Sequence, residues 1–193
     1  SLRLNYLGLH GPARWSYEFC RMMPSLLQAG HRVVAPDLIG FGKSDKPKKE
    51  SFHRFFRHRQ VVIELVEKLD LKNIVLVLPQ KTGWLGLTLP MSAPWRFQAL
   101  RVMSSMASWV DMPLTDGYQL WQQEVLDACE PCEELSSFAR HLSMLSEAAA
   151  WKAPFPDKGH SAALRYFSHV QAGVFPDDVN AVRQIATQFW RGI

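Results

Sequence analysis

The stretch at residues 76–90, LVLPQKTGWLGLTLP, decides the fold of this chain. Its first residues continue an apolar run that begins at Asn73 and has the composition of a strand buried on both faces of a parallel sheet. From Gly83 onward the pattern is that of a short, buried helix. A sharp turn between such a strand and helix often presents a nucleophile, but here it reads Pro-Gln-Lys-Thr. The stretch therefore predicts an enzyme-like scaffold with an unusual turn.

The rest of the chain alternates in the same way up to residue 105. Apolar runs at four places predict strands, and helical periodicity lies between them. This alternation indicates an α/β fold with a mostly parallel sheet flanked by helices. After residue 105 only helical patterns follow. We therefore expect a partial α/β core at 1–105 and an all-helical cap domain at 106–193. The predicted strands are 2–9, 31–37, 73–79 and 99–105, and the predicted helices are 15–28, 55–69, 83–91, 116–128, 133–145, 147–152, 159–170 and 177–190.

Composition excludes several classes of protein. The 193 residues are 47% hydrophobic and include seven Trp and eleven Phe, which is enough for one substantial core. The net charge of +4 gathers at 43–49 and 54–59, which favours a solvated basic face over a nucleic-acid partner. No apolar run is long enough for a membrane span, so no membrane partner is expected.

The cysteines favour a reduced, cytoplasmic setting. Cys20, Cys129 and Cys132 form no even framework of disulfide pairs. The spacing of the last two is that of some metal sites, but no second cysteine pair accompanies them, so we expect no metal. The opening SLRLNYLGLHG has the pattern of a strand entered midway, so we also expect further sequence upstream.

Several separate motifs resemble one family. They are LHG, WSYEF, MMPSL and GHRVVAPDLIGFGKSDKP, then LDLKNIVLV, LGLTLPM and APFPD, in this order from about Leu9 to Trp190. Together they resemble the haloalkane dehalogenases, which have the α/β-hydrolase fold with a helical cap. The resemblance implies hydrolysis of carbon–halogen bonds in small apolar halogenated substrates through an alkyl-enzyme ester. It implies an Asp nucleophile, a His with a supporting acid, and no metal or organic cofactor.

The catalytic turn departs from the pattern of the family. Dehalogenases have Gln-Asp-Trp-Gly-Gly there, and counting from both flanks gives an ungapped register. Pro79 then stands for the Gln, Gln80 for the nucleophilic Asp, and Lys81 for the halide-binding Trp. A neutral amide lacks the negative charge of a carboxylate nucleophile. The chain is therefore expected to be inactive as it stands.

The other site positions are incomplete as well. The resemblance places the two oxyanion-hole positions at Pro12 and Lys81, and proline has no N–H to donate. The family's His and supporting acid follow the cap and have no counterpart here. Of the halide-binding groups, Trp121 is a candidate for the second Trp, with a packing role as the alternative.

The alternative function is a non-catalytic binding or interaction protein. It would keep the α/β-hydrolase fold and self-associate through an exposed sheet edge. A hydrolase with Thr82 as the nucleophile is disfavoured, because Thr82 lies two residues past the nucleophile position. Codons for residues 81–84 can contain GAC-TGG in another frame, so either substitution or a shifted reading frame explains the turn.

Overall fold

The computed structural model describes residues 3–11, 14–79, 83–103, 147–171 and 177–192. A sheet of four strands in the order β2-β1-β3-β4 lies at its centre. All three neighbouring pairs are parallel, as the alternating pattern predicts. The strands are β1 (Asn5–Gly8), β2 (Arg32–Val34), β3 (Ile74–Leu78) and β4 (Phe97–Val102).

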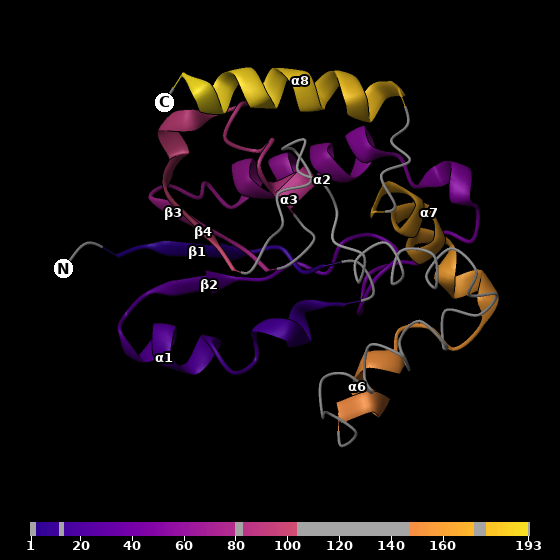
Figure 1. Ribbon diagram of the computed structural model, residues 1–193. Helices are drawn as coiled ribbons and strands as arrows, with labels where there is room; N and C mark the ends of the chain where they lie inside the picture. Colours follow the sequence, from indigo (N-terminus) through magenta and orange to yellow (C-terminus); the bar gives the residue numbers. More distant parts are fainter. Residues whose placement is uncertain (1–2, 12–13, 80–82, 104–146, 172–176, 193) are drawn as a thin grey trace, which may run out of the picture.

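Helices cover both faces of the sheet. Figure 1 shows α1 on one side and α2 and α3 on the other, with α8 beyond them. The helices are α1 (Met23–Gln28), α2 (Phe55–Lys68), α3 (Gly83–Gly86), α6 (Ala148–Lys152), α7 (Ala162–Gln171) and α8 (Asp177–Arg191). Short 3-10 helices are η1 (Ser16–Phe19), η2 (Glu50–Phe52), η3 (Pro94–Arg96) and η5 (Lys158–Ser161).

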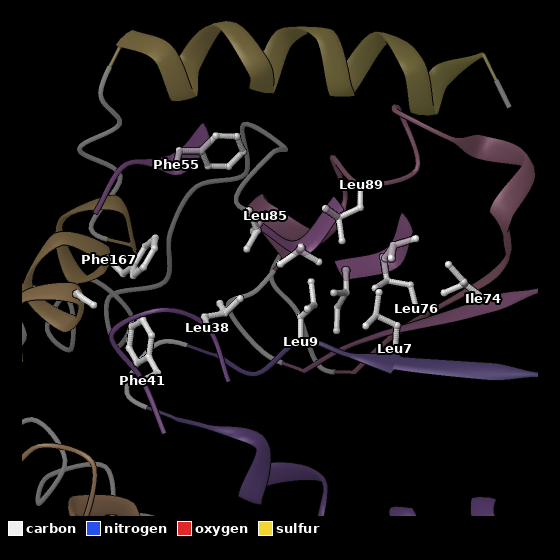
Figure 2. Close-up of a cluster of buried hydrophobic side chains, with 14 of the residues drawn as sticks. Leu7, Leu9, Leu38, Phe41, Phe55, Ile74, Leu76, Leu85, Leu89 and Phe167 are labelled. Carbon is white, nitrogen blue, oxygen red and sulfur yellow. The ribbon is translucent and has the colours of Figure 1, made fainter. Parts of the chain in front are cut away.

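β3 is the strand most deeply enclosed, since all five of its residues are buried. This is the expected result for a continuous apolar run in the interior of a parallel sheet. Figure 2 shows the main cluster of buried side chains, with Leu9 and Leu85 near its middle, Phe41 and Phe167 at one end and Ile74 at the other. The strand that leads into the catalytic turn is therefore held from both faces.

The predicted helix at 15–28 is two helices in the structure, and the boundary between them has a local cause. η1 ends at Phe19 and α1 begins at Met23, with Pro24 in its first turn. Proline has no N–H for an intrahelical bond, so it fits the first turn of a helix and not its interior. The helical periodicity is correct on both sides of this break.

The second half of the chain contributes to the same core. Ala163, Leu164 and Phe167 of α7 and Val182 of α8 belong to the buried cluster that includes β1 and β3. The described residues from 147 onward hold only helices and turns, in agreement with the sequence. The helices predicted at 116–128 and 133–145 lie outside the described residues. The domain boundary at residue 105 stays a prediction.

Candidate active site

The carboxyl ends of parallel strands are where ligands bind in open α/β sheets. Here the loops that follow β1 and β2 and the residue that follows β3 meet at this edge. Leu9 continues the ladder beyond β1, since its N–H donates to Val77 O over 3.1 Å. β3 ends at Leu78, and α3 begins at Gly83. The strand and the helix that flank residues 79–82 are therefore both present.

α3 packs unusually close to β3. A Cβ atom added at Gly86 would collide with the side chain of Leu78, so a larger residue here would require the buried Leu78 side chain to move. Close approach of this kind lets a helix leave a strand through a short turn. The structure thus keeps the frame of a strand–turn–helix elbow. The residues of the turn itself, Gln80, Lys81 and Thr82, lie outside the described residues, as do Pro12 and Trp121.

His10 follows β1 and is completely buried. Its Nδ1 donates to Gly11 O over 2.8 Å, and its Nε2 accepts the Leu38 N–H over 2.9 Å. Both nitrogens of the neutral ring therefore make hydrogen bonds. Burial is the main cause that lowers its pKa from 6.5 to about 4, against smaller opposing effects of Gly11 and Asp37. With its lone pair occupied, His10 links two loops and is unsuited to act as a general base.

Asp37 fixes the loop that follows β2. Its Oδ1 accepts the Ser16 N–H over 2.7 Å, and its Oδ2 accepts the Lys43 N–H over 2.8 Å. Gly42 lies directly against the carboxylate, with φ of +49°, and a Cβ atom there would collide with it. The carboxylate therefore accepts hydrogen bonds from two backbone N–H groups. These contacts give a structural reason for the Asp and the second Gly in the motif APDLIGFGKSDKP.

Glu18 is a site residue that the sequence interpretation missed. Its Oε2 accepts the Gly11 N–H over 3.2 Å, and its Oε1 pairs with Arg14 over 2.9 Å. Burial is the main cause that raises the pKa of this carboxyl, and Arg14 and Gly11 oppose the rise. A partly buried acid thus engages the loop in which the resemblance predicts the first oxyanion-hole position. The i, i+4 spacing of Arg14 and Glu18 was the available sequence signal.

The other described histidines also have structural surroundings. The ring nitrogens of His53 lie 2.9 Å from Pro47 O and 3.3 Å from His58 Nε2. His160 pairs with Asp157 over 2.8 Å at the start of η5. His141 and the side chain of His169 lie outside the described residues. Within the described part of the chain, no group of three or more His, Cys, Asp and Glu residues could hold a metal ion.

Comparison with known proteins identifies the family. Residues 7–124 match the alpha/beta hydrolase fold family. The chain belongs to this family. The scaffold predicted from the resemblance is therefore confirmed. Among the described residues of this α/β-hydrolase, no helix has the length and apolar composition to cross a membrane.

The most informative relatives are dehalogenases. The chain is 35% identical to a haloalkane dehalogenase of Psychrobacter cryohalolentis over 179 residues, which is 88% of this chain and 56% of that protein. It is 33% identical to haloalkane dehalogenase 1 of Mycobacterium tuberculosis, covering 88% of this chain and 57% of the other. The resemblance read from the motifs is thus confirmed. The chain spans little more than half the length of these curated relatives.

Solved structures that are similar to this chain are also haloalkane dehalogenases. The tetrameric haloalkane dehalogenase DpaA from Paraglaciecola agarilytica has a TM-score of 0.82 and 38% identity, covering 97% of this chain and 63% of its own. The haloalkane dehalogenase DbeA from Bradyrhizobium elkani has a TM-score of 0.76 and 25% identity, covering 97% and 69%. The described sheet and helices therefore follow the arrangement of this group of hydrolases.

Proposed function

We propose that this chain is a haloalkane dehalogenase-like α/β-hydrolase whose catalytic turn has lost its nucleophile, so that the chain as it stands does not hydrolyse carbon–halogen bonds. The observation that carries the proposal is the identity of residue 80. β3 and α3 keep their places on both sides of the turn, and the register from either side puts Gln80 where the family has Asp. An amide cannot form the alkyl ester on which the reaction depends.

The neighbouring residues support the same proposal. Pro12 has no N–H for the oxyanion hole, and the next N–H along the chain toward β1, that of Gly11, donates to Glu18. Loss of one oxyanion donor typically costs about 3 kcal/mol of transition-state stabilisation. His10 has no free lone pair to activate water. The Gly11 N–H and the His10 ring are thus both engaged in contacts that hold the loops of the fold.

A second candidate function is binding without catalysis, with self-association through the sheet edge. β4 is the last strand of the sheet and pairs only with β3 among the described strands. Trp95, just before β4, is 79% exposed, and Val102 and Met103 at its other end are exposed as well. The outer edge of such a terminal strand, with exposed apolar residues beside it, is a surface on which strands of other chains can pair. The relative from Paraglaciecola agarilytica, described as tetrameric, also supports assembly.

Halide release tests both candidates at once. The full chain is incubated with short bromoalkanes, and bromide is measured against a heat-treated sample of the same chain. We expect no bromide above the control. A rate above the control would contradict the lost nucleophile and the purely binding function together. A folded state is verified beforehand by circular dichroism, so that the absence of turnover reports on the site.

A further inference from the structure

His53 and His58 form a buried pair at the start of α2. Their exposed fractions are 0% and 1%, so water does not satisfy them. His53 Nε2 donates to Pro47 O over 2.9 Å. The Nδ1 of a neutral His53 is then an acceptor, and His58 Nε2 donates to it over 3.3 Å. The remaining His58 Nδ1 is buried and has no hydrogen-bond partner among the residues that the structure describes.

The pair lies at the place where α7 packs on the core. The rings of His58 and Phe167 meet edge to face with centroids 4.7 Å apart. Gly40 lies between His53 and Ala163 of α7, and a Cβ atom there would be 2.9 Å from His53 Cε1 and would collide with Ala163. Figure 2 shows Phe167 beside Phe41 at this end of the core. The two imidazoles therefore form part of the surface against which α7 packs.

The titratable and charged groups that face the pair do little to stabilise a positively charged imidazole. They are His10, Glu50, Arg57 and Arg165. Glu50, the one acid among them, already pairs with Arg165 of α7. The guanidinium of Arg57 lies over the ring of Phe52, with its Cζ 4.2 Å from the ring centroid. The remaining charges facing the pair are positive or become positive, so they disfavour a protonated imidazole.

Two ring nitrogens of the pair, His53 Nδ1 and His58 Nδ1, could take up an added proton, and protonation of either one is unfavourable. On His53 Nδ1 it would oppose the proton that His58 Nε2 donates. On His58 Nδ1 it would create a buried N–H without an acceptor. In agreement with this geometry, desolvation, with smaller effects of His53, His10 and Arg57, lowers the pKa of His58 to about 3. Desolvation also lowers the pKa of His53.

We propose that the His53–His58 pair is an acid-sensitive latch, which holds α7 against the core near neutral pH and releases it as the medium becomes acidic. Exposed imidazoles titrate near 6.5. Because the folded pKa values are lowered, the closed state keeps its full advantage above that pH and loses it as the pH falls toward the folded values. Each histidine freed by opening shifts the equilibrium about tenfold per pH unit in this window. The latch does not depend on the proposed loss of catalysis.

Native-state hydrogen exchange of the full chain tests the latch. Exchange is measured at pH 7.5 and 5.5, corrected for intrinsic rates, for amides of residues 162–167 in α7 and 74–78 in β3. We expect α7 to open more often than β3 at both pH values. Its opening constant should rise about tenfold to 100-fold from pH 7.5 to 5.5, depending on whether one or both histidines take up a proton.

Two variants separate the pair from general acid sensitivity. His58→Phe keeps a ring against Phe167 without a titrating group, and His53→Gln keeps a donor for Pro47 O. His58→Phe should reduce the pH effect on α7 about tenfold, because the folded pKa of His58 lies well below both pH values. His53→Gln should also reduce it, by up to tenfold, and serves as the test if His58→Phe does not fold. His31→Gln is the matched control, because His31 lies at the opposite end of the strands beside Leu4 and Tyr6. It should leave the pH effect on α7 unchanged.

Three results would overturn the latch. One is an opening constant of α7 that is the same at both pH values. Another is equal opening constants for α7 and β3 at each pH, which would mean that α7 exchanges only when the whole chain unfolds. The last is an undiminished pH effect in folded His58→Phe protein or, if that variant does not fold, in folded His53→Gln protein.

Discussion

Gly40 occupies a position that no other residue could take without moving its neighbours. Its φ of +91° lies in the left-handed region, and its missing side chain leaves room for His53 and Ala163. Glycine is needed here for two separate reasons, backbone conformation and space. The glycine-rich segment GFGKSDKP therefore serves the packing of α7 as well as the turn after β2.

Gly40→Ala should destabilise the chain by about 2–4 kcal/mol. Roughly 1–2 kcal/mol comes from the left-handed backbone, and a similar amount comes from overpacking. Gly30→Ala is the matched control, because Gly30 has φ of +82° and open space around it. It should cost only the backbone part. Urea unfolding of both variants measures the difference, and equal losses would contradict the packing role of Gly40.

At the scale of elements, α2 begins with a cap supplied from far along the chain. Arg54, its N-cap residue, makes no side-chain hydrogen bond to the first turn. The Phe55 N–H instead donates to the hydroxyl of Tyr166 in α7 over 3.1 Å. The unpaired N–H groups of a helix start need such partners. This contact also ties α7 to the core next to the histidine pair.

Tyr166→Phe should lower the free energy of unfolding by about 1 kcal/mol, because it removes one partner of a partly buried hydrogen bond. Tyr17→Phe is the matched control. The ring of Tyr17 packs on Trp15 and Trp151, but its hydroxyl has no hydrogen-bond partner in the described part of the chain. Thermal or urea unfolding should show a loss for Tyr166→Phe and a change within about 0.5 kcal/mol for Tyr17→Phe. Equal effects would argue against the cap.

The elements that apolar periodicity describes well could be predicted from sequence. The run at 73–79 predicted β3, and the pattern at 55–69 predicted α2, whose bounds are Phe55–Lys68. It was harder to predict from sequence which side chains of a helix face the core. Phe55 is buried, whereas the adjacent Phe56 is 47% exposed, and His58 lies in the same buried stripe of α2 as Phe55. Apolar periodicity does not predict which polar residue of a helix is buried in place of an apolar one. The burial of the His53–His58 pair could therefore be seen only in the structure.

At the scale of the whole molecule, the sheet and its family were predictable, because the motifs sit on the elements that form the core. For the site, the sequence could predict which positions correspond to those of the family, but not the contacts that the residues make. The resemblance predicts Gln80 at the nucleophile position, but no sequence pattern indicated that Glu18 accepts the Gly11 N–H or that His10 bonds to two loops. Such contacts join residues from separate loops, and local patterns carry no information about them.

The central claim is that the strand and helix around the turn are intact while the turn lacks its carboxylate. Gln80→Asp/Lys81→Trp restores the family's residues at both positions. With the described His10, His53 and His58 engaged in structural contacts, the restored Asp should form an alkyl ester that is not hydrolysed. Gln80→Ala/Lys81→Trp is the matched control, because it carries the Trp without the carboxylate.

Intact-mass spectrometry after incubation with a short bromoalkane measures this most directly, with peptide mapping to separate residue 80 from the exposed thiol of Cys20. The account predicts one alkyl group at residue 80 of Gln80→Asp/Lys81→Trp, one bromide released per chain, and no such adduct in the native chain or the control. An adduct or turnover in the native chain, or none in the restored variant, would contradict it.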